Sequence, residues 1–153
     1  MSSLPERVLV LPLEDKSGSN DPELAERVTE LLVAQVRMVS LATLGPREAA
    51  EIFEEMGMPM PTRFDAASLG RFCDATGCEA VITGAITTYE KGKAWSEDRL
   101  ALSVRAIDPR TGRTIRGTTF TSAGPRGDPS ARGLDQLCLY GVETVTRELA
   151  RAR

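Results

Sequence analysis

The sequence predicts a single α/β domain on a mixed, mostly antiparallel sheet of about four to five strands, with a C-terminal three-stranded meander and helices on both faces. Three observations predict this class. The run Val8–Leu11 is apolar at every position, as in a central strand covered on both sides. Apolar residues recur at three- and four-residue steps after Pro22 and after Pro129, which indicates helices. Between residues 79 and 122 the pattern changes to the period of strands.

The N-terminal third predicts a strand followed by a long helix. The strand covers residues 7–14, and Pro12 lies near its end because proline has no N–H for a ladder. Asp21 is the expected N-cap of the helix, and Pro22 takes its first position. The helix continues to about residue 39, with one apolar and one charged face.

The middle third predicts a short strand over residues 40–44 and two helices. The first helix covers residues 46–56 and ends at Gly57. Two prolines in the segment 58–64 exclude a helix there. Asp65 is the expected cap of the second helix, and Gly77 ends it.

The C-terminal part predicts the meander and a last helix. A strand over residues 79–89 and a polar tip over residues 90–98 precede a strand over residues 99–106, in which one face is apolar and the other is wetter. Turn residues at 108–112 send the third strand back antiparallel. A linker over residues 123–128 leads to the last helix, for which Asp128 repeats the cap expected at Asp21.

Length and charge limit the partners. The 153 residues fit one domain, which we place at residues 7–151 after a disordered tail over residues 1–6. The formal net charge of −3 provides no basic field, so we expect no nucleic-acid partner. No apolar run approaches the roughly 18 residues that cross a bilayer, so we expect no transmembrane segment in this chain.

The residues that carry most enzyme chemistry are missing or scattered. The chain has no histidine, the commonest general base and metal ligand, and its glycines form no phosphate-binding loop. Cys73, Cys78 and Cys138 match neither a zinc knuckle nor a redox motif, and we interpret them as buried thiols. Alternating oxygen-bearing side chains from Asp15 to Asp21 resemble a calcium loop only faintly. We therefore expect no catalytic residues, no metal and no cofactor.

Two segments are candidates for partner binding. Trp95 is the only tryptophan and lies at the polar hairpin tip between Lys91, Lys93 and Asp98, where an amphipathic ring can anchor a partner. The alternative is that the ring folds back over its own sheet. The second candidate is a proline-bearing segment with the apolar side chains Met58, Met60 and Phe64. Methionine in such a crossover also serves to cap a core, so this alternative stays open.

Three segments together carry a resemblance to a known family. They are Val8–Gly18, Gly77–Gly84 and Ile107–Gly112, in that order along the chain. This pattern resembles the superfamily of TolB N-terminal-like domains, which includes CsgG, LpoB and PelC, from about residue 7 to residue 122. The resemblance implies a non-enzymatic, lipoprotein-like accessory or scaffold protein of the bacterial cell envelope. Such a protein associates with itself and docks on a secretion, polysaccharide-export or peptidoglycan-synthesis machine.

The location depends on what precedes this sequence in the full protein. With a removed leader, we expect a periplasmic or outer-membrane-associated protein; without one, we expect a cytoplasmic protein. The alternative function is accordingly a cytoplasmic regulatory or sensor domain that binds a protein partner. The loops are too short for membrane-spanning hairpins, which disfavours a pore. The reading frame upstream of Met1 distinguishes the two locations, because a leader that ends in a lipidation cysteine supports the envelope.

Overall fold

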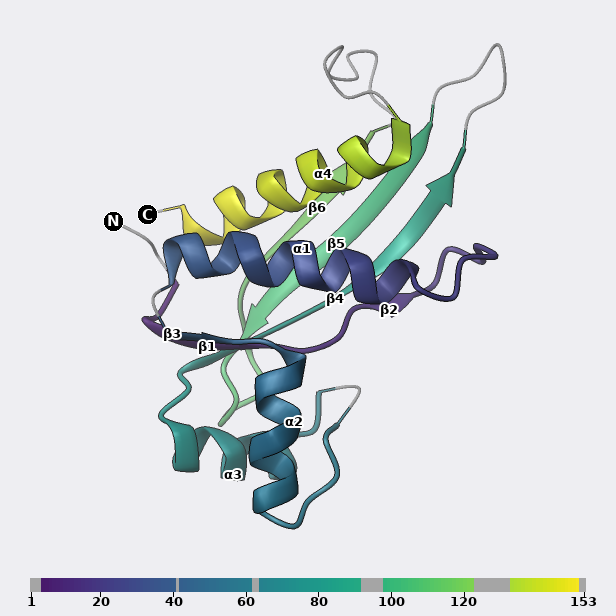
Figure 1. The fold of residues 1–153 in the computed structure, drawn as a ribbon. Coiled ribbons are helices and arrows are strands. Elements are labelled where there is room, and N and C mark those ends of the chain that lie inside the picture. Colours follow the sequence, from purple (N-terminus) through teal and green to yellow (C-terminus); the bar gives the residue numbers. More distant parts are fainter. Residues whose placement is uncertain (1–3, 41, 62–63, 92–97, 123–132, 152–153) are drawn as a thin grey trace.

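The computed structural model describes residues 4–40, 42–61, 64–91, 98–122 and 133–151. Within these ranges the chain forms one α/β domain with four helices and a six-stranded sheet (Figure 1). The strands are β1 Arg7–Val10, β2 Glu14–Asp15, β3 Ala42–Leu44, β4 Ala80–Glu90, β5 Arg99–Ile107 and β6 Thr114–Thr121. The helices are α1 Leu24–Val39, α2 Pro46–Glu55, α3 Ala66–Thr76 and α4 Gly133–Ala150.

The sheet is mixed, as predicted. Its order is β3-β1-β4-β5-β6, and β2 pairs with β4 beyond the end of β1. The pairs β1–β3, β1–β4 and β2–β4 are parallel, whereas β4–β5 and β5–β6 are antiparallel. The three-stranded meander β4-β5-β6 is therefore confirmed. Its second turn is the expected one, because Gly112 has a φ of 74° and Asp108 N donates to Arg113 O at 2.8 Å.

The predicted strand over residues 7–14 is split into β1 and β2. Leu11 N still donates to Ile82 O at 2.9 Å, but Pro12 has no N–H to donate. Leu13 N donates instead to Thr29 Oγ1 on α1, at 2.9 Å. Pairing with β4 resumes at β2, which adds one strand to the number expected from the sequence.

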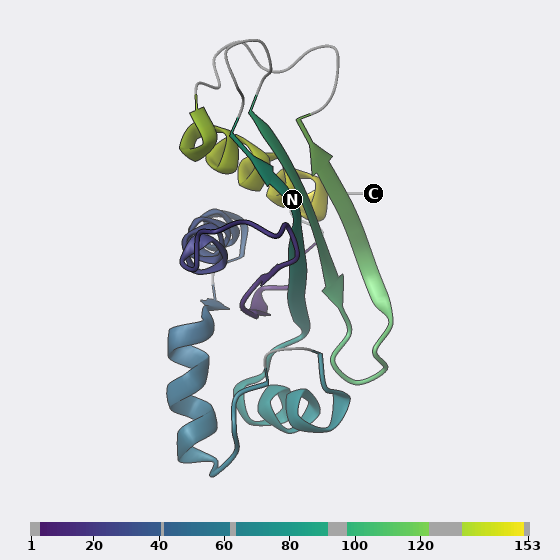
Figure 2. The ribbon, with the colours of Figure 1, turned by 90° about the vertical axis from the view of Figure 1, so that its right-hand side faces the viewer.

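Helices lie on both faces, which confirms that prediction. On one face α1 and α4 pack side by side over the sheet (Figure 2), and their contacts with it form a first core cluster. On the opposite face α2 and α3 contact β1 and the start of β4. They form a second core cluster, which consists of Leu9, Leu11, Ala49, Phe53, Leu69, Phe72, Cys73, Cys78 and Val81. Leu4, in the tail expected over residues 1–6, is 7% exposed and belongs to the first cluster.

The helix ends agree with the sequence at α3 and differ at α1. Asp65 accepts a hydrogen bond from Ala67 N, and Gly77 ends α3 with a φ of 79°. Helix α1 begins at Leu24 rather than Pro22. Its N-cap is therefore Glu23, two residues after the expected cap Asp21. The Asp21 carboxylate instead binds Arg27 at 2.6 Å and accepts from Glu23 N at 3.0 Å, and both bonds lower its pKa. The cap expected at Asp128 lies outside the described residues.

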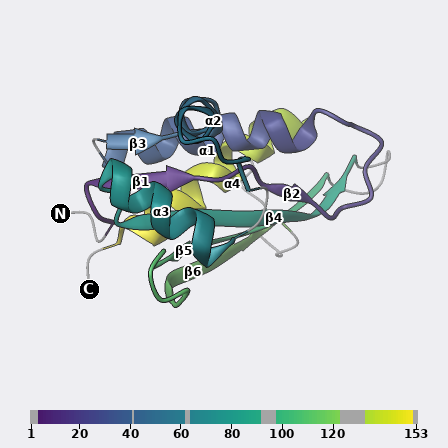
Figure 3. The ribbon, with the colours of Figure 1, turned by 90° about the horizontal axis from the view of Figure 1, so that it is seen from below.

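The second helical layer covers only part of its face. The second core cluster, through which α2 and α3 pack against β1 and the beginning of β4, contains no residue of β5 or β6. Seen from below, α3 lies across the beginning of β4 and α2 is viewed end-on (Figure 3). Five residues that β4, β5 and β6 present on this face are half-buried or exposed, namely Thr83, Ala85, Ser103, Arg105 and Thr119. None of the described helices combines the length and apolar character that a membrane span requires.

Candidate functional site

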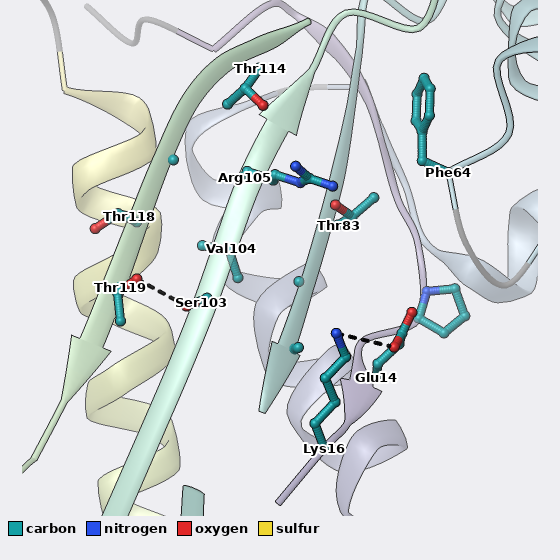
Figure 4. A pocket seen from close by; sticks show the side chains of 14 residues that line it. Glu14, Lys16, Phe64, Thr83, Ser103, Val104, Arg105, Thr114, Thr118 and Thr119 are labelled. Carbon is teal, nitrogen blue, oxygen red and sulfur yellow. Dashed lines mark hydrogen bonds and ion pairs between the residues drawn. The ribbon is translucent and has the colours of Figure 1, made fainter. Parts of the chain in front are cut away.

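The uncovered face of the meander forms an open groove of about 620 Å³. Its floor consists of β4, β5 and β6. One wall is formed by Pro12 in the connection from β1 to β2, Glu14 of β2 and Lys16 just after β2 (Figure 4). Phe64, which lies just before α3, closes one end. The groove exists because α2 and α3 end before they reach β5 and β6.

Strand register arranges the polar side chains of the groove in rows. Glu14, Ala85, Ser103 and Thr119 are paired in sequence across β2, β4, β5 and β6. The neighbouring row contains Thr83, Arg105 and Gly117. Because alternate residues of a strand point to opposite faces, each row places its side chains on the same side of the sheet.

Two pairs of polar side chains in the groove bind each other, and one of its two cations has no partner among the described residues. Ser103 Oγ and Thr119 Oγ1 are hydrogen-bonded at 2.9 Å, and Lys16 Nζ lies 3.8 Å from Glu14 Oε2. The exposed Arg105 side chain extends across β4 toward Thr83 (Figure 4). Within the described ranges its guanidinium makes no hydrogen bond or ion pair. Arg105 therefore offers a planar set of donors to a carboxylate of a partner.

The polar side-chain groups that line the groove are hydroxyls, one carboxylate and two cations. Its hydroxyl groups have no histidine beside them, because the chain contains none. The described residues hold no group of three or more metal-ligating side chains. The groove therefore offers hydrogen-bonding groups, one ion pair and one cation that is unpaired within the described ranges, all on the surface of the sheet.

The calcium-like loop is closed by its own hydrogen bonds. The Asp15 carboxylate accepts from Ser17 N at 2.9 Å, from Ser17 Oγ, and from Ser19 Oγ at 2.9 Å. Partial burial opposes ionisation of Asp15, but these hydrogen bonds outweigh it and lower the pKa. The structure supports the simpler interpretation of a strand-to-helix turn.

The predicted partner-binding residues belong to two segments, and the structure describes all three residues of the segment with Met58, Met60 and Phe64. Met58, Met60 and Phe64 are half-buried and pack against the second core cluster. Their contact with a partner stays a prediction. Of these three residues only Phe64 lines the groove. Its ring lies beside Gly112, where an added Cβ atom would be 3.5 Å from Phe64 Cε1.

Of the predicted hairpin-tip residues Lys91, Lys93 and Trp95, the structure describes Lys91 alone. Lys91 is exposed and directly follows β4, whose end lies opposite to α2 and α3 in the fold (Figure 1). Trp95 and Lys93 lie outside the described residues. The two predicted contact segments therefore do not form one continuous described surface.

The groove itself was not predicted as a site. The sequence did show a wetter face on the strand 99–106, and Ser103 and Arg105 belong to it. That pattern is equally typical of any half-exposed strand. The informative feature, an uncovered polar face beside a second helical layer, depends on how far α2 and α3 extend.

No family model and no curated protein matches the sequence. The search of solved structures does give matches. The chain is similar to the PelC dodecamer structure from Paraburkholderia phytofirmans, with 15% sequence identity and a TM-score of 0.66. The match covers 100% of this chain and 95% of that chain. The chain is also similar to lipoprotein GNA1162 from Neisseria meningitidis, with 16% sequence identity and a TM-score of 0.54. This match covers 77% of this chain and 81% of that chain.

The C-terminal domain of LpoB from Salmonella enterica also matches, with 12% sequence identity and a TM-score of 0.51. The match covers 77% of this chain and 83% of that chain. These identities are low, so the similarity concerns the fold. The resemblance expected from the three strand-and-turn segments is confirmed at that level. The chain has a TolB-N/LpoB/PelC-like fold.

Proposed function

We propose that this protein is a non-enzymatic accessory or scaffold protein of the bacterial cell envelope. It acts by self-association and by docking on a secretion, polysaccharide-export or peptidoglycan-synthesis machine. The observation that carries this proposal is the similarity to the PelC dodecamer over 100% of this chain and 95% of that chain. The similarity to lipoprotein GNA1162 supports the envelope location.

The composition of the groove supports a binding role. Ser103 and Thr119 bind each other, and no histidine is present to activate either hydroxyl. An open, polar sheet face beside a free cation matches what a polar protein interface requires. The chain has 22 acidic and 19 basic residues, and we propose that a second copy supplies a carboxylate for Arg105.

We further propose that the partner contacts include the hairpin-tip residues Lys91, Lys93 and Trp95 and the segment with Met58, Met60 and Phe64. A tryptophan that follows two lysines at a hairpin tip is a candidate interface anchor, because tryptophan is enriched among the residues that contribute most binding energy. Phe64 joins the second segment to the end of the groove. Self-association and docking on another protein then use distinct surfaces.

The first prediction concerns the oligomeric state. Purified protein is expected to scatter light as an assembly larger than the monomer, with an average mass that falls on dilution. Trp95→Ala is expected to weaken docking on a protein partner at least tenfold, because such anchors contribute most of an interface's affinity. A strict monomer at all concentrations, together with intact partner binding by Trp95→Ala, contradicts the proposed function.

The second prediction concerns the groove. Arg105→Glu is expected to weaken self-association at least tenfold, about 1.4 kcal/mol, because it replaces an interfacial cation by a like charge. Sedimentation equilibrium measures the association constant. Arg113→Glu is the matched control, because Arg113 is an exposed arginine outside the groove and the charge change is the same. Equal weakening by both variants indicates a general charge effect and contradicts a contact at the groove.

A further inference from the structure

Two of the three thiols lie together at the end of α3. Cys73 is in the last turn of the helix and is 2% exposed, and Cys78 follows the helix and is 6% exposed. Both side chains belong to the second core cluster. Cys138 is on α4, in the first core cluster on the other face of the sheet. The structure therefore separates the cysteines into a pair and a single thiol.

The left-handed turn at Gly77 brings the pair together. Gly77 has a φ of 79°, and its N–H donates to Cys73 O at 2.8 Å. A helix end of this kind folds the chain back. The residue after the glycine then comes close to the residue four positions before the glycine. Here those two residues are Cys78 and Cys73, whose buried side chains lie in the same core cluster and shift each other's pKa. Their spacing of five residues matches no sequence motif for a dithiol.

Polar groups around the turn distinguish the two thiols. Arg7 lies over the turn and donates from Nη1 to Thr76 O at 3.4 Å. The Cys73 thiol, followed by Thr76 and the Arg7 charge, lowers the pKa of Cys78 against the opposing effect of burial. The Cys78 thiol and burial raise the pKa of Cys73. Cys78 also stands between two exposed residues, Gly77 and Glu79, so a small reagent reaches it first.

We propose that Cys73 and Cys78 form a redox-active pair that closes to an intramolecular disulfide by exchange with a small-molecule or protein disulfide. The Cys78 thiolate attacks one sulfur of the oxidant, which releases one thiol and leaves a mixed disulfide on Cys78. Cys73 then gives up its proton and attacks Cys78 Sγ, which releases the second thiol. Two protein thiols are oxidised, and the oxidant's disulfide is reduced to two thiols.

The disulfide would join the end of α3 to the start of β4, next to Arg7 of β1. Such a bond closes a short loop and persists in an oxidising compartment such as the bacterial periplasm. The proposal does not rest on the proposed function, because it needs no partner and no assembly.

The test incubates the folded full chain with glutathione disulfide and then counts free thiols after denaturation. Two of the three thiols are expected to be lost, with a mass decrease of about 2 Da and a Cys73–Cys78 cross-link in the peptide map. Cys138→Ala is the matched control and is expected to form the same cross-link. Three free thiols after incubation, or a cross-link that includes Cys138, overturns the proposal.

Single variants assign the two roles. In Cys73→Ala the mixed disulfide on Cys78 has no resolving thiol, so a stable glutathione adduct of about 305 Da is expected. In Cys78→Ala the buried Cys73 is expected to stay unmodified over the same time. Equal adducts on both variants contradict Cys78 as the attacking thiol. The peptide map of the unmodified chain still decides the cross-link if either variant fails to fold.

Discussion

Gly84→Ala is expected to destabilise the folded protein by about 3 kcal/mol, at the upper end of the usual cost of overpacking a core. Gly84 lies in the middle of β4, opposite Val104 of β5. A Cβ atom there would lie 2.4 Å from Ser103 O, 2.8 Å from Val104 Cγ1 and 2.9 Å from Leu13 Cδ2. The first of these neighbours is backbone, so relief requires the strands to move apart. Urea unfolding measures the loss as a lower midpoint with an unchanged slope.

The same substitution is expected to change the groove. Leu13, whose side chain lies beside Gly84, directly precedes Glu14 of β2, and Glu14 and Lys16 line one wall of the groove. Gly70→Ala is the matched control, because a Cβ atom at Gly70 on α3 meets nothing within 4 Å. This control is expected to keep or raise stability by about 0.5 to 1 kcal/mol, as alanine favours helices. A loss in the control as large as that in Gly84→Ala contradicts the close-approach argument.

The parts of the fold that the sequence predicted are those set by local rules. Asp65 and Gly77 delimit α3 through a side-chain cap and a positive φ, and each depends on a residue type at one position. The meander follows from alternation and from the turn that ends at Gly112. At the start of α1 two local signals competed, because Asp21 also binds Arg27, and the helix began later than expected.

The candidate site depended on contacts that are distant in sequence. The groove exists because α2 and α3 cover β1 but not β5, and no local pattern reports how far a helix extends over a sheet. The split of the first strand likewise required Leu13 to find Thr29 on α1. The pairing of Cys73 with Cys78 follows from the conformation of Gly77, which a search for known cysteine spacings does not consider.

Phe72→Ala is expected to lower the free energy of unfolding by about 3 to 5 kcal/mol, because it leaves a cavity in the second core cluster. The Phe72 and Phe53 rings are stacked with centroids 4.6 Å apart and an interplanar angle of 13°. Both side chains are fully buried between α2, α3 and the sheet. Denaturant unfolding checks the value, and Leu139→Ala, at a side chain 39% exposed on α4, is the control with an expected change below about 0.5 kcal/mol.

The Phe72 variant also tests whether the second cluster supports partner binding. Met58, Met60 and Phe64 pack against this cluster, so a cavity beneath them is expected to loosen the segment that they form. Under conditions in which Phe72→Ala is still folded, docking through that segment should weaken. Self-association through Arg105 should change less, since β5 and β6 lie outside the cluster. A Phe72→Ala protein that is destabilised as expected but docks like the unmodified chain would exclude Met58, Met60 and Phe64 from the contact surface and leave the hairpin tip as the docking segment.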